Sequence, residues 1–331
     1  MKNYVLGLDI GGTKCAAILG KGDASESSPE SLIIDKIGFP TEQPRGWKKV
    51  VEDLFNACDL LLERNGLQNA DLRSIGVSCG GPLSSEEGVI YSPPNLPDWD
   101  GVPITAMLTE RYSVPAFLQN DANACALAEW RFGAGRGFKN LIFLTFGTGM
   151  GAGLILEGKL YSGANDLAGE VGHVRLAETG PSGYGKNGAF EGFCSGGGIA
   201  RLAKSMAEDW LAKGNKSSLC QSKNDMDSVT AKSVAEAAKS GDILAKEVYN
   251  VSGKYLGRGL SILIDILNPE AIVIGSIFER SGELLIPAME QTLKEEALPL
   301  ALENCRILPA KLGDKIGDYA ALGVALNGIV D

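Results

Sequence analysis

The chain has 331 residues, of which 44% are hydrophobic and 22% charged, a composition typical of a globular protein long enough for two domains. Its 31 basic and 41 acidic residues give a net charge of −10, and no basic tract is present, which argues against a nucleic-acid partner. No membrane partner is expected either, because the longest apolar run, around LSILIDIL, contains Asp265 and is too short to span a bilayer.

The first residues enter a predicted strand at once and show no signal-peptide pattern, which predicts a cytoplasmic protein. Seven cysteines are scattered along the chain without Cys-x-x-Cys pairs, and most of them stand among apolar residues. We therefore expect reduced and mostly buried thiols.

The first half of the chain mixes predicted strands and helices. A helix is predicted at about 46–65, where Val50, Leu54, Cys58 and Leu61 recur at helical spacing. A Pro-rich loop, SPPNLPDW, follows the fourth strand. The other elements predicted here are strands at 3–9, 14–20, 31–38, 74–81 and PAFLQN, and helices near 103–111 and from about Asp121.

The second half opens with a predicted hairpin at 141–157 and continues through a Gly-rich segment at 163–198. Thr230 is a candidate N-cap for a helix at 230–239. The other elements predicted here are helices at about 196–213, 241–267, 281–296 and 318–329, and strands at 271–276 and RILPAK. Strands that alternate with helices indicate α/β layers in each half.

Two glycine-rich turns follow the same plan, an apolar run, a Gly/Thr turn and a second apolar run. The first lies in VLGLDIGGTKCAAIL (5–19) and the second in LIFLTFGTGMGAGLILE (141–157). Such turns can point several backbone N–H groups at one anion such as a phosphate. Because there are two, in different halves, they indicate two lobes that grip a polyphosphate between them. The alternative is a pair of ordinary hairpins whose glycines only permit positive φ.

Several polar residues are candidates for chemistry. Asp9 stands between Leu8 and Ile10 at the end of an apolar strand, where an unpaired carboxylate is costly, so we expect it to meet a cation, a backbone amide or water. Asn120 and Asp121 end one strand and open a helix, so Asp121 either reaches into a cleft or caps the helix.

Four more candidates lie in loops. Asn95, in SPPNLPDW, is either a turn residue or a ligand contact. His173 is the only histidine and follows Glu170 by three residues, and each is either a hydrogen-bonded structural residue or a ligand. Glu191 lies in GAFEGFCSGGG, where glycines let a carboxylate approach a small polar ligand.

Taken together and in this order, these segments resemble the ROK family (repressor, open reading frame, kinase) of sugar kinases in the actin-like ATPase superfamily, over nearly the whole chain. The resemblance implies an α/β protein of two actin-like ATPase (ribonuclease H-like) domains with a ligand cleft between them. The domains would span 1–119 and 120–317, with the C-terminal helix 318–331 packing back on the first.

The resemblance also implies roles for residues. LGLDIGGTK (6–14) is similar to the first phosphate loop, in which Asp9 orients magnesium and its water. The segment 78–104 carries a sugar-contacting asparagine, here Asn95, and in QNDANACALAEW (119–130) Asn120 binds sugar and Asp121 is the general base.

The second phosphate loop would lie at 146–151, followed by the sugar ligands Glu170 and His173, with Glu191 as a further sugar ligand. GFCSGGG (192–198) and IVIGS (272–276) would border the adenine. The implied ATP-binding residues are Asp9, Gly11, Gly12, Thr13, Lys14, Gly147, Thr148, Gly149, Gly196, Gly197 and Gly275.

One departure from the family concerns zinc. Many ROK members carry Cys-x-Cys-Gly-x-x-Gly-Cys just before the equivalent of Glu191, and three thiolates with the histidine bind zinc. Here the segment reads SGYGKNGAFE, with Ser182, Tyr184 and Ala189 where the cysteines would stand. These side chains cannot complete a tetrahedral site, so the sequence predicts no zinc and leaves His173 to bind a sugar hydroxyl.

The activity that the resemblance implies is Mg²⁺-dependent phosphoryl transfer from ATP, or from polyphosphate, to a hexose or N-acetylhexosamine. Glucose and then N-acetylmannosamine are the first choices, while N-acetylglucosamine and fructose stay open. The resemblance to the family also implies a homodimer. One alternative is a sugar-responsive transcriptional repressor, disfavoured here because no DNA-binding extension precedes the first strand. The other is a sugar- or nucleotide-binding protein without catalysis.

Overall fold

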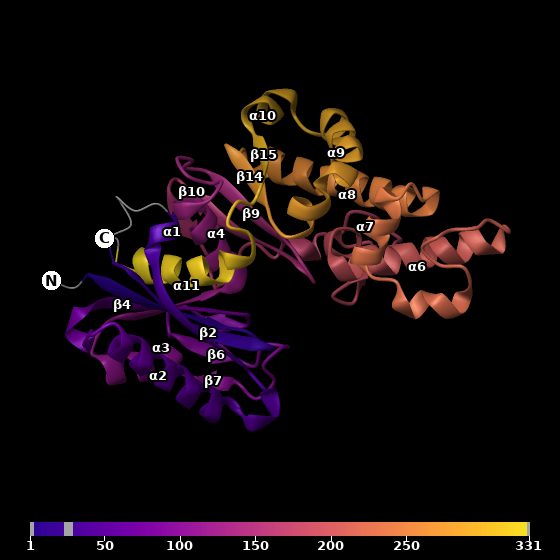
Figure 1. Ribbon diagram of the computed structural model, residues 1–331. Helices are drawn as coiled ribbons and strands as arrows, with labels where there is room; N and C mark the ends of the chain where they lie inside the picture. The colour runs from indigo at the N-terminus through magenta and orange to yellow at the C-terminus, as the bar shows by residue number, and fades with distance from the viewer. Residues whose placement is uncertain (1–2, 23–28, 330–331) are drawn as a thin grey trace. The chain divides into compact units, whose positions relative to one another are not determined.

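The computed structural model describes residues 3–22 and 29–329 (Figure 1). The chain forms two compact units. Unit 1 comprises residues 1–137, 153–168 and 311–331, and unit 2 comprises 138–152 and 169–310. In the described part of the chain, no helix combines the length and the apolar composition that a membrane span requires.

Unit 1 is built on a five-stranded sheet with the order β3-β2-β1-β4-β8. Strands β1, β4 and β8 are parallel, while β2 is antiparallel to both β1 and β3. In register, Ile10 of β1 lies beside Cys79 of β4, and Cys79 beside Asn120 of β8. The carboxyl ends of the three parallel strands therefore meet at one edge. The strands are Tyr4–Ile10 (β1), Lys14–Lys21 (β2), Ile33–Pro40 (β3), Leu72–Cys79 (β4) and Ala116–Asn120 (β8).

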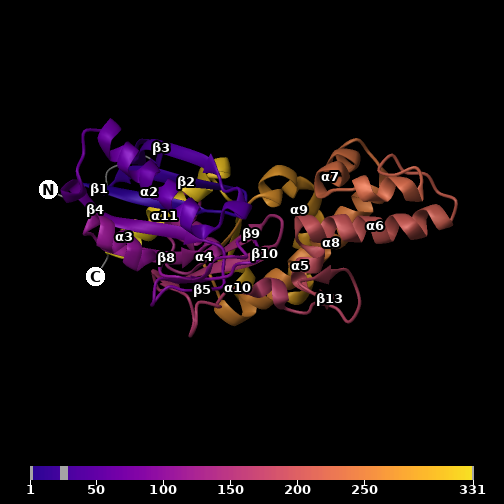
Figure 2. The same ribbon diagram turned by 90° about the horizontal axis from the view of Figure 1, so that it is seen from below.

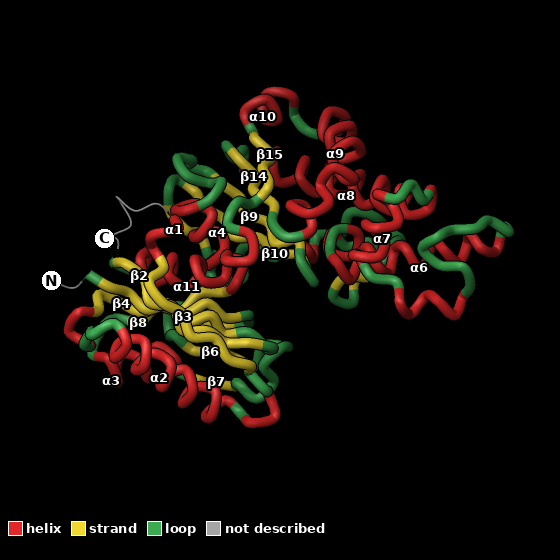
Figure 3. Tube along the Cα trace, viewed as in Figure 1, coloured by secondary structure: helices red, strands yellow, loops and turns green. Residues whose placement is uncertain are grey.

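Helices cover both faces of this sheet (Figure 3). Helices α2 (Trp47–Arg64) and α3 (Ile104–Tyr112) pack on one face, and α11 (Ile316–Asn327) packs on β1 and β4 with α4 (Asp121–Phe132) beside it. The sequence places α11 last, yet its Ala321 and Leu322 contact the first strand at Gly7. Unit 1 also holds α1 (Pro29–Leu32), β11 (Lys159–Tyr161) and a small sheet of β5 (Leu83–Ser84), β6 (Val89–Tyr91) and β7 (Asp100–Val102).

The second five-stranded sheet has the order β11-β10-β9-β14-β15, and β14 is parallel to both β9 and β15. Its strands are β9 (Leu141–Phe146), β10 (Met150–Leu156), β14 (Ala271–Ile274) and β15 (Arg306–Pro309), with β11 at the edge. The strand β14 is fully buried, as the apolar run in the sequence predicts.

The helices of unit 2 gather around α8 (Ile243–Leu267), which packs against α6 (Gly196–Ala212), α7 (Ala231–Lys239) and α9 (Ile277–Glu296) (Figure 2). Short helices α5 (Phe190–Phe193) and α10 (Pro299–Asn304) also contact α8. A two-stranded hairpin, β12 (Ser182–Gly183) and β13 (Lys186–Asn187), precedes α5.

Two departures from the sequence predictions concern helices. Helix α9 begins at Ile277 and not at 281, because Ser276 and Glu279 form a capping box, and the backbone at Ser281 is the only non-helical point inside it. Helix α4, predicted to open the second domain at residue 120, lies in unit 1 because it packs on α11. The seven cysteines are free, five of them buried and two half-buried, which confirms the expectation from composition.

Candidate active site

The first glycine turn is tied down through its carbonyl groups. Gly11 N–H bonds to Lys14 O at 3.1 Å and closes the turn between β1 and β2. The carbonyl oxygens of Gly11 and Thr13 accept from the hydroxyl and the N–H of Thr41, at 2.6 and 3.0 Å. In a planar trans peptide the C=O and N–H groups point in opposite directions. The N–H groups that follow these carbonyls therefore point away from Thr41, as an anion-binding turn requires.

Glycine is required at position 12 by a close neighbour. A Cβ there would lie 2.5 Å from the backbone O of Asn95 and 2.8 Å from its Cβ. The Gln43 amide joins the two segments, donating to Gly12 O at 3.0 Å and to Asn95 O at 2.5 Å. Asn95, expected from its loop to be a turn residue or a ligand contact, thus lies against the first glycine turn.

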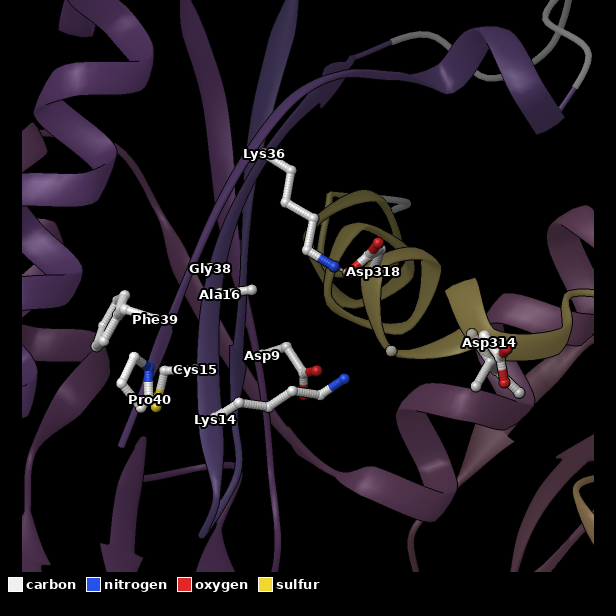
Figure 4. Close-up of a pocket in the computed structure, with 12 residues that line it drawn as sticks. Asp9, Lys14, Cys15, Ala16, Lys36, Gly38, Phe39, Pro40, Asp314 and Asp318 are labelled. Atoms are coloured by element: carbon white, nitrogen blue, oxygen red, sulfur yellow. Dashed lines mark hydrogen bonds and ion pairs between the residues drawn. The ribbon is translucent and has the colours of Figure 1, made fainter. Parts of the chain in front are cut away.

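Asp9 and Lys14 line a pocket of about 530 Å³ in unit 1. Figure 4 shows their side chains entering it from the neighbouring strands β1 and β2. At its far wall Lys36 of β3 forms an ion pair with Asp318 of α11, with Nζ and Oδ1 2.5 Å apart. Gly317 leaves room for Asp9, because a Cβ there would lie 2.7 Å from Asp9 Oδ2. The Asp9 carboxylate therefore faces the N-terminus of α11, where negative charge is favoured.

Burial raises the pKa of Asp9 from 3.8 to about 6, and the negative charge of Asp318 adds to the rise, whereas Lys14 and Lys36 oppose it. The half-buried Asp9 carboxylate, in a pocket whose wall also carries Asp314 and Asp318, suits a magnesium ion that keeps most of its water shell. Within residues 3–22 and 29–329, no three His, Cys, Asp or Glu side chains are grouped so as to hold a metal ion directly.

Asn120, and not Asp121, caps helix α4. The Asn120 side chain accepts from Asn123 N–H at 2.8 Å and donates to Asp166 O at 3.3 Å. Asp121 is the first helical residue, and its Oδ1 accepts from Ala122 N–H at 2.8 Å. The surrounding protein raises the pKa of Asp121 by desolvation, which the Ala122 hydrogen bond partly offsets, although the side chain keeps contact with solvent.

Asp9 and Asp121 belong to the same edge of the first sheet. Asp9 is the last residue but one of β1 and Asp121 directly follows β8, and these parallel strands are separated only by β4. Two strand spacings correspond to roughly 10 Å. The negative charge of Asp121 contributes to the raised pKa of Asp9, but less than burial and the charge of Asp318 do.

The second glycine turn, in unit 2, is tied down in the same way as the first. The carbonyl oxygens of Gly147 and Thr148 accept from Gly196 N–H at 2.7 Å and Gly197 N–H at 3.4 Å, at the start of α6. The following N–H groups, those of Thr148 and Gly149, therefore point away from α6. The strand end that carries Gly275 joins this region, since Gly275 N–H bonds to Leu144 O at 3.0 Å and a Cβ on Gly147 would be 3.7 Å from Ser276 Oγ.

The predicted sugar ligands of unit 2 lie beside this turn. Glu191 Oε2 accepts from Met150 N–H at 3.1 Å, and a Cβ on Gly172 would be 3.3 Å from Glu191 Cβ. Gly172 belongs to the short turn between Glu170 and His173, in which His173 N–H bonds to Glu170 O at 3.2 Å. Unit 2 thus brings Glu191 together with the segment 170–173.

The predicted residues therefore form two sets. Unit 1 holds Asp9, Gly11, Gly12, Thr13, Lys14, Asn95, Asn120 and Asp121, and unit 2 holds Gly147, Thr148, Gly149, Glu170, His173, Glu191, Gly196, Gly197 and Gly275. The sequence did not point to several residues that support the first set, namely Lys36, Thr41, Gln43, Asp166, Gly317 and Asp318. The one signal available was Gly317-Asp318 at the start of a helix.

Comparison with known proteins gives a consistent result. Residues 5–327 match the ROK family. A glucokinase of Halalkalibacterium halodurans is 32% identical over 318 residues, 95% of this chain and 92% of that protein. A ROK family glucokinase from Streptomyces griseus, solved with glucose and AMPPNP, is 28% identical with a TM-score of 0.70, covering 97% of this chain and 99% of the other.

The relatives also include a regulator, a xylose repressor of Caldicellulosiruptor bescii, 28% identical over 98% of this chain and 79% of its own length. The likeness to the solved glucokinase confirms the predicted fold, a two-domain α/β protein of the actin-like ATPase type.

Proposed function

The chain belongs to the ROK family, and we propose that it is an ATP-dependent sugar kinase. The observation that carries this proposal is the pair of glycine turns whose carbonyl groups bond to the protein and whose amides point away from it, with Asp9 beside the first and Glu191 beside the second. The glucokinase of Halalkalibacterium halodurans and the Streptomyces griseus structure with glucose and AMPPNP support it.

In this proposal Asp121 accepts the proton of the attacking sugar hydroxyl. It is the first residue of α4, so its own helix bond to Ala122 fixes the carboxylate at the sheet edge. Desolvation raises the pKa of this carboxyl, which makes its carboxylate a stronger base for the proton of the hydroxyl. Asn120, held by Asn123 and Asp166, and Asn95, held at the first turn, would bind other sugar hydroxyls.

The amides of both turns and Lys14 would stabilise the charge of the transferred phosphoryl group, as is usual in phosphoryl transfer. Asp9 would hold the water shell of magnesium, which neutralises phosphate charge when bound. Two segments would border the adenine, the one with Gly196 and Gly197 and the one with Gly275. The first bonds to the second glycine turn, and the second continues into Ser276, which lies beside that turn. Glu170, His173 and Glu191 would complete the sugar contacts from unit 2.

Glucose is the proposed substrate, with N-acetylmannosamine next. The test is a coupled assay of ADP release with Mg²⁺-ATP and a panel of glucose, N-acetylmannosamine, N-acetylglucosamine and fructose, compared by kcat/KM. Product formation with polyphosphate in place of ATP is measured in parallel by mass. Sugar-dependent ADP release, highest with glucose, supports the proposal. ADP release that no sugar stimulates contradicts it.

A sugar-responsive regulator is the second candidate function, favoured by the xylose repressor among the relatives. Such a protein would bind the sugar without turning it over. Isothermal titration with the same sugar panel separates the two functions, because sugar binding without any consumption of ATP or polyphosphate favours the regulator.

A further inference from the structure

His173 is held by two contacts from the β12–β13 hairpin. Its backbone carbonyl accepts from Lys186 Nζ at 2.7 Å. Its ring meets the ring of Tyr184 edge-on, with centroids 4.9 Å apart and planes at 62°. The backbone and the imidazole of one residue are thus held by two residues of one hairpin.

Tyr184 adopts an unfavourable backbone conformation, and its side chain is mostly exposed. Its φ is +47° and that of Gly185 is +77°, the left-handed pair of a tight hairpin turn. An aromatic residue rarely adopts this conformation, and a residue that keeps it commonly serves a site. The Tyr184 side chain is also 71% exposed, so packing in the core does not explain its position. The contact with His173 does.

The base of the hairpin is fixed to the rest of unit 2. Leu176 N–H bonds to Gly188 O at 2.8 Å, and Phe190 N–H bonds to Val174 O at 2.8 Å. Phe190 is buried and its ring fills the space left by Gly259 of α8. Glu191 follows directly, so movement of the hairpin base would move Glu191 as well as His173.

We propose that Tyr184 and Lys186 are positioning residues that set the imidazole of His173 for sugar binding, so that the hairpin works as a metal-independent clasp. The inference rests on the proposed sugar-kinase function. Ser182 and Ala189 flank the clasp and offer no sulfur ligand for a metal ion. The aromatic contact with Tyr184 and the hydrogen bond from Lys186 position His173 instead.

The activity-independent test uses the fact that His173 is the only histidine. In protein with isotope-labelled histidine, the imidazole resonances belong to His173 without further assignment. Tyr184→Ala should shift these resonances, because the neighbouring aromatic ring is lost, and Tyr184→Phe should leave them in place. Tyr161→Ala, at another exposed tyrosine, is the control and should not move them.

The kinetic test separates positioning from catalysis. Tyr184→Ala should raise the KM for sugar about tenfold, the upper range of one aromatic contact, and leave kcat and the KM for ATP near those of the wild type. Tyr184→Phe should restore the wild-type KM. Lys186→Met should raise the sugar KM in the same way, and Lys186→Arg should restore it.

Three results would overturn the inference. They are unchanged His173 resonances in Tyr184→Ala, a Tyr184→Phe variant as impaired as Tyr184→Ala, and His173 resonances that a zinc chelator shifts and added zinc restores. If circular dichroism shows that Tyr184→Ala does not fold, the sugar KM of Lys186→Met tests the inference in its place. Failure of the wild type to phosphorylate any sugar would refute the proposed function, while the resonance test still reports on the clasp.

Discussion

Asp9 places a carboxylate in a half-buried pocket between two charged groups that act on it in opposite directions. Asp318 raises its pKa, and Lys36, the ion-pair partner of Asp318, lowers it. The ion pair joins β3 to α11, which are 282 residues apart in sequence. Burial is the largest cause of the raised pKa of Asp9, and each member of the ion pair modifies that pKa from outside the glycine turn.

The pH at which activity falls on the acid side should depend on this ion pair, and removing either of its charges should shift that pH in opposite directions. Only ionised Asp9 can hold the magnesium water shell, so kcat/KM for ATP in the wild type should fall as the pH drops through about 6. Asp318→Asn removes a negative charge, lowers the pKa of Asp9 and should move the midpoint to lower pH. Lys36→Met removes a positive charge and should move it to higher pH.

The measurement is a pH profile of kcat/KM for the three proteins in one buffer series. Opposite shifts support the electrostatic role of the pair. Equal shifts in the same direction would show that the pair acts by holding the structure together.

Ionised Asp9 should also lower the stability of the fold. Because the pKa in the folded protein is about 6 and the ordinary value is 3.8, the native state binds more protons between these values. The free energy of unfolding then decreases as the pH rises through this window. Asp9→Asn removes the effect and should be more stable than the wild type at pH 8 by up to roughly 3 kcal/mol.

Urea denaturation at several pH values measures this difference, which should shrink toward zero near pH 4. An Asp9→Asn variant less stable than the wild type at pH 8 would show that the carboxylate makes a stabilising contact in the native state.

Most individual elements could be predicted from the sequence, because apolar periodicity fixes them locally. The helix predicted at 46–65 is α2, and the strand predicted at 271–276 contains the buried β14. Three short strands, β5 to β7, were missed because each has only two or three residues, too few to show a period. The hairpin around Tyr184 was missed because it has no alternating pattern.

The sequence points to residues of the proposed site where one segment carries its own signal, and not where distant segments meet. Asp9 and the glycine turns are local patterns, and Asp121 follows a strand. The partnership of Lys36 with Asp318 and the contact of Gly12 with Asn95 depend on tertiary packing. No local pattern in the sequence indicates them.

The contact between the first turn and the Asn95 loop can be tested by a matched pair of variants. Gly12→Ala would bring a Cβ against the backbone of Asn95, whereas Gly80→Ala meets only Pro93 Cβ at 3.9 Å. Gly12→Ala should therefore lower kcat/KM at least about tenfold through misplacement of the turn. Gly80→Ala should stay within about twofold of the wild type. Steady-state kinetics with Mg²⁺-ATP and glucose measures both, and similar values for the two variants would contradict a steric role for the contact.

At the scale of the whole molecule, the sequence predicts magnesium and no zinc. EDTA should abolish activity, and added Mg²⁺ alone should restore it fully. The thermal unfolding midpoint in a zinc-selective chelator should equal that in buffer, because Ser182, Tyr184 and Ala189 supply no thiolate. Metal analysis of the purified protein is the control. Stoichiometric zinc, or a midpoint that the chelator lowers and zinc restores, would contradict this prediction.

The residues proposed for one reaction belong to both units, with Asp9, Asn120 and Asp121 in unit 1 and Glu170, His173 and Glu191 in unit 2. Phosphoryl transfer in such a protein depends on positioning and electrostatics, and proton acceptance is the step assigned to a single side chain. The proposed function can therefore be tested at proton acceptance by Asp121, in the intact protein.

The most direct measurement compares wild type and Asp121→Asn in the coupled assay with glucose and Mg²⁺-ATP, with glucose binding measured by titration calorimetry. The expected result is glucose-dependent ADP release by the wild type, and an Asp121→Asn variant that still binds glucose but loses at least about 100-fold in kcat. Near-normal turnover by Asp121→Asn, or no sugar-dependent ADP release by the wild type, would contradict it.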